Sequence, residues 1–269
     1  MSRFTAAWLA LRERYDLAAR NLDVLKVVTD SLKSAASVDI LDLACGSGST
    51  VRALHKQLPS RQRWELVDND PDLLGLAAKH NLDRDVRVNA VPLDLSRNLE
   101  AALGRTIDLI TISALLDLVS ESWLHRLLNA VAARALPVYA ALTYDGRIEL
   151  SPADPVDAAI VFAVNAHQRS DKGFGPALGP SAAAFGIAQF QSLKYSVTSG
   201  NSDWIIGPDA SEMQNELLEG WAKAAHDMQT RSGVEIASWL ARRKAALGAG
   251  LSSMRVGHVD FFAVPTSTR

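Results

Sequence analysis

The sequence predicts an α/β fold with a doubly wound, mostly parallel sheet of seven strands. Residues 38–48 read Val-Asp-Ile-Leu-Asp-Leu-Ala-Cys-Gly-Ser-Gly, which combines an apolar strand pattern with a glycine loop. A helical pattern with Val51, Leu54 and Leu58 on one face follows at once. Strand patterns then alternate with helical ones along the chain. Such sheets bind their ligands outside the carboxyl ends of the strands.

Residues 4–34 precede the first strand and predict one or two amphipathic helices. Apolar residues recur at helical spacing from Trp8 to Leu32. We therefore divide the chain into an N-terminal helical segment, residues 1–35, and an α/β domain, residues 36–269.

Polar or small residues follow each of the next three strand patterns. They are Asp68-Asn69 after residues 64–67, Asp94-Leu95 after residues 86–93, and Ser113-Ala114 after residues 107–112. Because the carboxyl ends of parallel strands meet at one sheet edge, we expect these residues to lie together. Asp68 lies 20 residues beyond Gly48, where an acidic residue accepts hydrogen bonds from ribose hydroxyls. Asp70 before Pro71, and Ser120, are typical helix N-caps.

Residues 145–182 form a predicted insertion after the fifth strand, which we place at residues 137–142. A helix over 156–164 leads into residues 165–180, a long loop whose end is rich in glycine and proline. Long ordered loops on a rigid scaffold often carry substrate contacts, so we interpret the insertion as a substrate cap. The alternative is a mobile surface loop. The candidate substrate-binding residues are Gln168, Asp171, Lys172 and Phe174.

The remaining chain completes the predicted sheet. Residues 195–206 indicate a sixth strand or a hairpin, two helices follow at 210–229 and 234–247, and residues 255–264 form the last strand. His258 and Asp260 alternate onto one face of it, which favours a buried pair bonded to the insertion over a catalytic dyad.

The glycine loop Asp42-Leu-Ala-Cys-Gly46-Ser-Gly48 resembles the D/E-x-x-x-G-x-G motif of the class I S-adenosylmethionine-dependent methyltransferases. The resemblance covers residues 36–145, with four motifs in the right order. The nicotinamide pattern fails because Val51 stands where a third glycine belongs, and no Gly-Lys-Ser/Thr follows for a phosphate loop. The resemblance implies a Rossmann-like fold and S-adenosylmethionine as cofactor.

The resemblance also implies a role for each strand-end residue. Asp42 would orient the loop and the methionine amino group. Asp68 would accept from the ribose diol and Asp94 from the adenine amino group, unless Asp94 only caps a turn. The other implied contacts are Ala44, Gly46 and Gly48 to the methionine part, Asn69 and Leu95 to the adenine, and Ser113 and Ala114 to the sulfonium.

Members of this family commonly use an N-terminal helix as a lid over the cofactor. Tyr15 and Arg20 are the candidate cofactor contacts in this segment, with Arg20 placed to pair with the methionine carboxylate. The alternative is that Tyr15 belongs to the core and Arg20 is solvated.

The implied reaction is methyl transfer by in-line displacement, which requires alignment and the exclusion of water. A base is needed only if the acceptor is a hydroxyl or an ammonium, and Asp117 and His167 are then the candidate catalytic residues. Asp117 is equally suited to cap the helix that begins near Ser120.

The net charge and the missing motifs exclude several classes of binding partner. A net charge of −2 and an isoelectric point near 6.3 give no basic field for nucleic acid. The DNA-base amino-methylation motif is also missing, so we expect a small-molecule acceptor and a monomer or homodimer. No apolar run suits a membrane helix, and charges interrupt any signal sequence, so we expect a cytoplasmic protein. Cys45 is interpreted as packing, and no spacing indicates a metal site. A regulatory S-adenosylmethionine-binding protein and an aminopropyltransferase or dehydrogenase are the alternatives.

Overall fold

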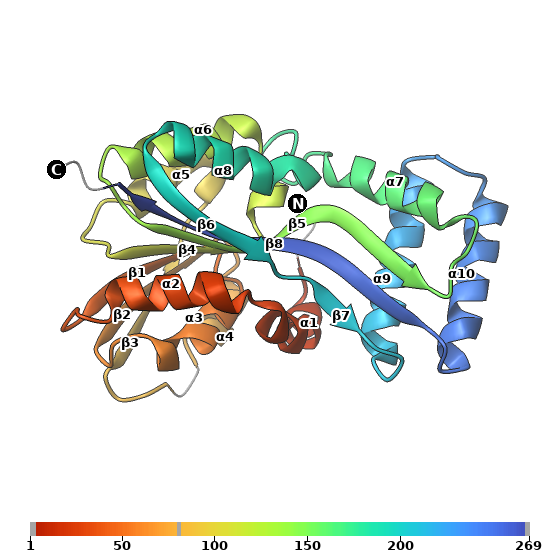
Figure 1. Cartoon of the computed structure of the whole chain (residues 1–269), viewed down its shortest axis with the longest axis horizontal. Helices are drawn as coiled ribbons and strands as arrows, with labels where there is room; N and C mark the ends of the chain where they lie inside the picture. The colour runs from red at the N-terminus through yellow and green to blue at the C-terminus, as the bar shows by residue number, and fades with distance from the viewer. Residues whose placement is uncertain (1–3, 80–81, 267–269) are drawn as a thin grey trace.

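The computed structural model describes residues 4–79 and 82–266, and it centres on one twisted sheet (Figure 1). Residues 1–3 of the predicted N-terminal segment lie outside the described part. The strand order is β3-β2-β1-β4-β5-β8-β6, and β7 pairs with β8. The strands are β1 Val38–Leu43, β2 Gln62–Asp68, β3 Val86–Pro92, β4 Leu109–Ser113, β5 Val138–Ser151, β6 Tyr195–Asn201, β7 Trp204–Ile206 and β8 Ser253–Pro265.

The doubly wound, mostly parallel sheet predicted from the sequence is confirmed. Strands β1 to β5 run parallel to their neighbours, and β8 runs antiparallel to β5, β6 and β7. The order reverses between β1 and β4, so their carboxyl ends open a crevice there. The sheet has eight strands because residues 195–206 form two short strands.

Strands β6 and β7 pair with β8 in one continuous register. Tyr195 lies opposite Pro265, Asn201 opposite Val259, and Trp204 opposite Val256. A hairpin would pair the two segments with each other, so the hairpin alternative is wrong. They are one strand line interrupted at residues 202–203.

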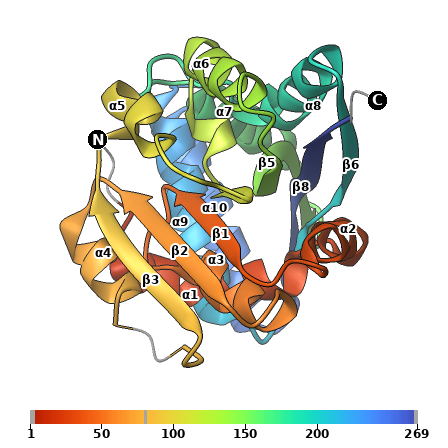
Figure 2. The same ribbon diagram turned by 90° about the vertical axis from the view of Figure 1, so that its left-hand side faces the viewer.

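Helices cover both faces of the sheet (Figure 2). Helices α5, α6 and α8 pack on one face of the sheet and enclose a first apolar core. Helices α2, α3 and α4 pack on the other face and enclose a second apolar core. This double cover explains the almost continuous apolar sequences of β1 and β4. The helices are α1 Ala6–Ala19, α2 Leu22–Leu32, α3 Ser49–Leu54, α4 Pro71–Ala77, α5 Leu95–Ala102, α6 Glu121–Ala132, α7 Asp157–Gln168, α8 Ala182–Ser192, α9 Ser211–Asp227 and α10 Gly233–Gly248.

The fifth strand runs well past its predicted end at Leu142. Leu142 has a positive φ of 56°, and the register with β8 shifts twice between Ala140 and Ile148, so the strand bends without ending. The polar Asp145-Gly146-Arg147 sequence therefore lies within a strand. Residues 145–151, the first part of the predicted insertion, therefore belong to β5.

The ends of β5 and β8, together with β7, form an extension of the sheet. Helices α7, α9 and α10 pack on it around a third apolar core that includes Trp204 and Trp239 (Figure 1). Residues 204–258 thus belong to the same unit as the start of the predicted cap. Helix α1 lies against this unit, because Trp8 packs edge-on against Trp204 with ring centroids 6.4 Å apart.

Asp260 in β8 is fully buried and joins three segments. Its Oδ1 accepts from the Leu142 amide at 2.7 Å, and its Oδ2 accepts from the Tyr139 hydroxyl at 3.1 Å and the Asn21 amide at 3.0 Å. A buried carboxylate with several donors is a strong local constraint. Asp260 therefore fixes both the bend in β5 and the corner between α1 and α2. Its partners among the described residues lie outside residues 145–182, so the predicted hydrogen bond from Asp260 to the insertion is not found there.

Candidate functional site

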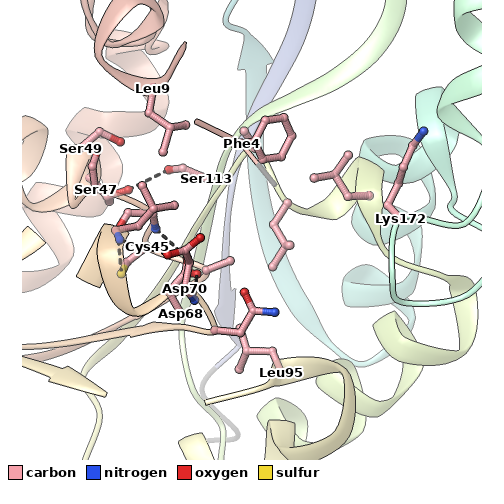
Figure 3. A pocket seen from close by; sticks show the side chains of 18 of the residues that line it. Phe4, Leu9, Cys45, Ser47, Ser49, Asp68, Asp70, Leu95, Ser113 and Lys172 are labelled. Carbon is pink, nitrogen blue, oxygen red and sulfur yellow. Dashed lines mark hydrogen bonds between the residues drawn. The ribbon is translucent and has the colours of Figure 1, made fainter. Parts of the chain in front are cut away.

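A pocket opens at the carboxyl ends of β1, β2 and β4, beneath α1 (Figure 3). The strand-end loops form one side of it, and residues of the loop after α7 form the other. Its lining residues are Phe4, Leu9, Arg12, Asp16, Ala44, Cys45, Gly46, Ser47, Ser49, Thr50, Asp68, Asn69, Asp70, Leu73, Leu93, Leu95, Ser113, Ala114, Leu115, Leu118, Lys172 and Phe174.

The loop after β1 depends on its two glycines. Gly46 and Gly48 have φ values of 53° and 80°, a region that side chains disfavour. A Cβ on Gly46 would lie 3.3 Å from Leu9 Cδ1, and one on Gly48 would lie 3.1 Å from Ala77 Cβ. The loop is therefore packed between α1 and α4, with its backbone facing the pocket. Gly48 itself does not line the pocket.

Asp68 at the end of β2 links two loops. Its Oδ2 accepts from the Gly46 amide at 2.9 Å, and its Oδ1 accepts from the Asp70 amide at 2.9 Å. Asp70 is the N-cap of α4, as predicted, and its Oδ1 accepts from the amides of Asp72 and Leu73. Because a carboxylate has about four acceptor positions, Asp68 retains capacity for a ligand in the pocket.

Asp42 lies fully buried beneath the glycine loop and does not line the pocket. Its Oδ1 accepts from the Thr111 hydroxyl at 2.7 Å, whereas Oδ2 has no hydrogen-bond partner among the described residues. Burial raises the pKa of Asp42 to about 7, against the opposing effects of Thr111 and Arg20. An unpaired buried oxygen at this position fits a hydrogen-bond donor supplied from the ligand side.

Arg20 approaches the pocket from below its floor. It is 5% exposed, and its guanidinium donates to the Tyr139 hydroxyl and to the Ser113 hydroxyl, each at 3.3 Å. Ser113 also accepts from the Thr50 hydroxyl at 3.1 Å and lines the pocket. The solvated alternative for Arg20 is therefore wrong, and Arg20 reaches the pocket only through Ser113.

Tyr15 lies away from the pocket, against the third apolar core, where its hydroxyl accepts from Arg14 at 2.5 Å. The residues that α1 presents to the pocket are instead Leu9, Arg12 and Asp16. The core alternative for Tyr15 describes its position.

Arg12 and Asp16 are the site residues that sequence reasoning missed most clearly. They form a buried pair, with Nε to Oδ2 at 2.9 Å and Nη2 to Oδ1 at 3.2 Å. Trp204 holds them, since its indole donates to Asp16 Oδ1 at 3.0 Å and the Arg12 guanidinium lies 5.0 Å above its ring. Opposite charges at i and i+4 were the available signal, but the same spacing is common on solvated helix faces.

At the adenine side of the expected site, Asn69 and Leu95 line the pocket. Asp94 is the N-cap of α5, and its Oδ1 accepts from the Ser96 amide at 2.9 Å and hydroxyl at 2.6 Å. These bonds lower the pKa of Asp94, so it is ionised at neutral pH. The capping interpretation thus describes Asp94 as the structure shows it, and Asp94 is not in the pocket wall.

The insertion delivers Lys172 and Phe174 to the pocket, but not His167, Gln168 or Asp171. Helix α7 continues to Gln168 because residues 165–168 contain no helix breaker, so their prediction as loop is wrong. His167 Nε2 lies 3.9 Å from the Asp227 carboxylate, on the α9 side. Lys172 donates to the His167 carbonyl at 3.0 Å and so caps the helix.

The loop after α7 has a defined conformation. Asp171 Oδ1 accepts from the amides of Gly173 at 2.6 Å and Gly175 at 3.0 Å. Phe174 packs edge-on against Trp123, with ring centroids 5.5 Å apart. The loop is thus an ordered wall of the pocket, and Asp171 acts by shaping it.

Asp117 lies buried directly behind the wall formed by Leu115 and Leu118, and its Oδ1 has no hydrogen-bond partner among the described residues. Burial raises its pKa to about 6, which the nearby charges of Arg12 and Lys172 oppose. Ser120 caps α6 by accepting from the Trp123 amide at 3.2 Å. The alternative in which Asp117 caps this helix is therefore wrong.

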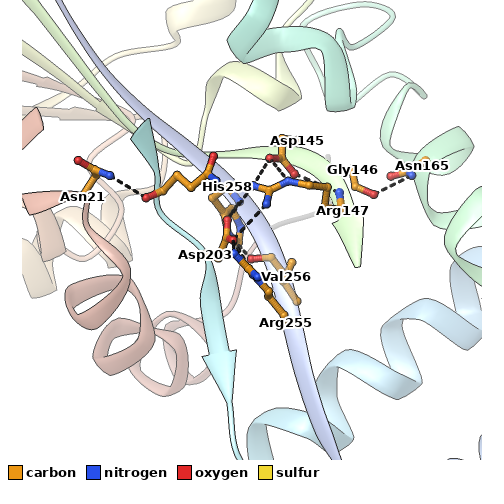
Figure 4. Close-up of polar contacts among 10 residues, drawn as sticks. Asn21, Asp145, Gly146, Arg147, Asn165, Asp203, Arg255, Val256 and His258 are labelled. Atoms are coloured by element: carbon orange, nitrogen blue, oxygen red, sulfur yellow. Dashed lines mark hydrogen bonds and ion pairs between the residues drawn. The ribbon is translucent and has the colours of Figure 1, made fainter. Parts of the chain in front are cut away.

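A second charged cluster lies in the extension, away from the pocket (Figure 4). Asp203, at the break between β6 and β7, accepts from Arg147 at 2.8 and 3.2 Å, from Arg255 at 2.7 Å and from the His258 amide at 3.1 Å. Arg147 also donates to Asp145 at 2.7 Å. These mutual bonds join β5, β8 and the break, so the cluster is structural.

Among residues 4–79 and 82–266, neither a metal-binding group nor a membrane-spanning helix is found. No group of three or more histidine, cysteine, aspartate or glutamate side chains in that part is arranged to hold a metal ion. None of its helices combines the length and apolar character needed to cross a membrane.

The raised pKa of Asp42 predicts a pH effect on stability. The folded-state pKa of about 7 lies above the unfolded value near 3.9, so the folded protein binds this proton more tightly. The contribution of Asp42 to stability is complete below pH 4 and is lost as the pH rises through 7. Asp42→Asn should therefore lose less unfolding free energy than the wild type between pH 5 and 7.5, as measured by urea denaturation. Asp72→Asn, on the exposed first turn of α4, is the control and should keep the wild-type dependence. Identical curves for wild type and Asp42→Asn would contradict the raised pKa.

Comparison with known proteins agrees with this geometry. Residues 40–137 match the methyltransferase domain family. No curated protein matches the chain. A cyclopropane-fatty-acyl-phospholipid synthase-like protein from Lactobacillus casei has a similar structure, with a TM-score of 0.52 and 15% identity, over 97% of this chain and 94% of that one. The YcgJ protein from Bacillus subtilis is similar with a TM-score of 0.50 and 14% identity, over 92% of this chain and 100% of that one. At these identities the likeness concerns the fold. The family match over residues 40–137 and the glycine loop at the sheet edge agree with the resemblance to the class I S-adenosylmethionine-dependent methyltransferases.

Proposed function

We propose that the chain transfers the methyl group of S-adenosylmethionine to a small-molecule acceptor within this pocket. The observation that carries the proposal is the composition of the pocket wall. It joins the strand-end residues of a cofactor site to Lys172 and Phe174 of an ordered insertion loop (Figure 3). A protein that only binds the cofactor has no need of a second, elaborated wall.

The described residues fit the cofactor at several points. Asp68 presents a carboxylate with unused acceptor capacity, which suits a ribose diol. The unpaired Oδ2 of Asp42 supports an amino group held near the glycine loop. Ala44 and Gly46 line the pocket where the methionine part would lie, and we propose that Gly48 acts there by shaping the loop.

For the other cofactor contacts, we propose Asn69 and Leu95 beside the adenine, with Asp94 accepting from its amino group. The carboxylate of Asp94 caps α5 through Oδ1, which leaves Oδ2 with acceptor capacity. Ser113 and Ala114 would lie next to the sulfonium. Arg20 would orient the Ser113 hydroxyl from below, in place of a direct contact with the cofactor.

Bound S-adenosylmethionine supplies an electrophilic methyl group, so the protein has to align the acceptor and exclude water. The pocket lining also includes apolar Leu115, Leu118 and Phe174 together with the side chains of Arg12 and Lys172. Such a mixture suits a compact, partly apolar acceptor with a polar group. We propose Lys172 and Phe174 as direct contacts, with Asp171 supporting them. Gln168 lies outside the pocket wall, so its proposed contact has no support from the geometry.

A proton must leave when the acceptor is a hydroxyl or an ammonium. We propose Asp117 as the base in that case, because its pKa of about 6 leaves it mainly ionised at neutral pH and its Oδ1 lacks a donor. His167, the other candidate, faces α9, so Asp117 is favoured.

The cofactor assignment predicts that Asp68→Ala weakens the binding of S-adenosylhomocysteine. Leaving the ribose hydroxyls unpaired costs about 1–3 kcal/mol, which corresponds to roughly 5- to 150-fold in dissociation constant. Isothermal titration calorimetry measures the effect, with the exposed Asp72→Ala as the control. Binding of NADH by the wild type, without binding of S-adenosylhomocysteine, would refute the assignment.

The acceptor assignment predicts that substitutions of Phe174 and His167, two residues of the insertion, affect kcat/KM for the acceptor to different extents. Phe174→Ala removes a pocket wall, so kcat/KM for the acceptor should fall at least tenfold while cofactor affinity stays nearly unchanged. His167→Ala, outside the pocket, should change kcat/KM less than twofold. A screen of metabolite extracts with methyl-labelled cofactor supplies the acceptor for the assay. The reverse order of effects would move the acceptor site toward α9.

A further inference from the structure

Arg52 in α3 contacts two separate segments behind the glycine loop. Its Nη1 donates to the Ser47 carbonyl at 2.6 Å, and Ser47 lies in the loop and lines the pocket. Its Nε and Nη2 donate to the two carboxylate oxygens of Glu13 in α1, each at 2.6 Å. One side chain therefore joins the glycine loop to the helix above it.

The surroundings of Arg52 strengthen these bonds. The Arg52 and Glu13 side chains are only 19% and 21% exposed, and a bidentate pair in such partial burial is stronger than a surface pair. The guanidinium also lies beside the glycine loop, since a Cβ on Gly48 would be in contact with Nη1 at 3.4 Å.

Helix α1 depends on such polar links more than on apolar burial. Its only buried residues are the charged Arg12 and Asp16, at 9% and 6% exposure, while Trp8 and Leu9 remain partly exposed. A segment with few buried apolar side chains opens locally at a low free-energy cost. The charge contacts of α1 therefore carry a large share of its attachment, with Asp16 held by Trp204 on one side and Glu13 by Arg52 on the other.

We propose that Arg52 is a positioning residue that couples the conformation of the glycine loop to the closure of α1 over the pocket. With the Glu13 pair formed, Leu9 covers Gly46 and the Ser47 carbonyl is held in place. Without it, α1 lifts more often and a bound cofactor leaves faster. The effect on the cofactor rests on the proposed function, whereas the attachment of α1 does not.

The test compares the release of labelled S-adenosylhomocysteine from the wild type, Glu13→Gln, Arg52→Gln and the double variant. Glu13→Gln removes the link to α1 and leaves the bond to Ser47, so release should be about fivefold faster, the equivalent of roughly 1 kcal/mol. Arg52→Gln should be at least as fast, and the double variant no faster than Arg52→Gln. Arg52→Lys, which keeps the charge, should recover part of the retention when Glu13 is present and none with Gln at position 13.

Glu100→Gln is the matched control. It breaks a bidentate pair with Arg126, between α5 and α6, in which the arginine also donates to a backbone carbonyl, that of Ser96 at 2.9 Å. Release from this variant should equal that from the wild type. The proposal is overturned if Glu13→Gln behaves like this control, or if the effects of the two single substitutions add in the double variant.

Hydrogen exchange separates failure of the coupling from failure of the proposed function. In the ligand-free protein, amides of residues 6–19 should exchange faster in Glu13→Gln than in the wild type. A wild type that binds no S-adenosylhomocysteine would defeat the proposed function, and the exchange of α1 would then decide the coupling alone. Equal exchange in both proteins overturns it.

Discussion

The hydrogen bond from the Gly46 amide to the Asp68 carboxylate, 2.9 Å long, is the interaction on which the site depends. It joins the loop after β1 to the tip of β2, and the same carboxylate accepts from Asp70 at the start of α4. The φ values of Gly46 and Gly48 are required by this closed loop. Asp68 thus both fixes the conformation of the glycine loop and presents hydrogen-bond acceptor positions to the pocket. Because one carboxylate holds the loop and also faces the pocket, the loop after β1 and the end of β2 act as one unit of the site.

The extension of the sheet gives the pocket its second wall. Strand β5 bends without ending, and its continuation pairs with β8 to form the surface on which α7, α9 and α10 pack. Asp260 fixes the bend by accepting from the Leu142 amide. Helix α1 lies between this unit and the glycine loop, with Trp8 against Trp204 and Leu9 against Gly46. Any displacement of α1 therefore affects its contacts with the extension and with the glycine loop together.

Much of the central sheet could be predicted from local sequence, because each strand pattern ends at residues whose chemistry serves the sheet edge. Gly46, Asp68 and Ser113 lie at the strand ends and line the pocket, whereas Asp42 is buried beneath the loop. The extension could not be predicted in this way. Its strand continues through Asp145-Gly146-Arg147, where Arg147 pairs with Asp145 and also with Asp203, far along the chain. Pairing between segments that are distant in the sequence carries the strand through these residues, and local patterns do not show such pairing.

In the insertion, too, local sequence predicted only part of the structure. Lys172 and Phe174 were identified from a loop rich in glycine, but His167 belongs to a helix end whose direction is set by α9. On α1, Arg12 and Asp16 have the spacing of a solvated pair, and only Trp204, brought in by β7, makes them part of a buried wall. Residue type and spacing located the strand-end side of the pocket well. They located the opposite side poorly, because it is assembled from three distant segments.

The most direct test of the account is a crystal structure of the protein with S-adenosylhomocysteine bound. We expect the ribose hydroxyls at the Asp68 carboxylate, the methionine part along Gly46 and the sulfur atom near Ser113, facing Phe174 across the pocket. Ligand density at another site, or a ribose turned away from Asp68, would contradict the account.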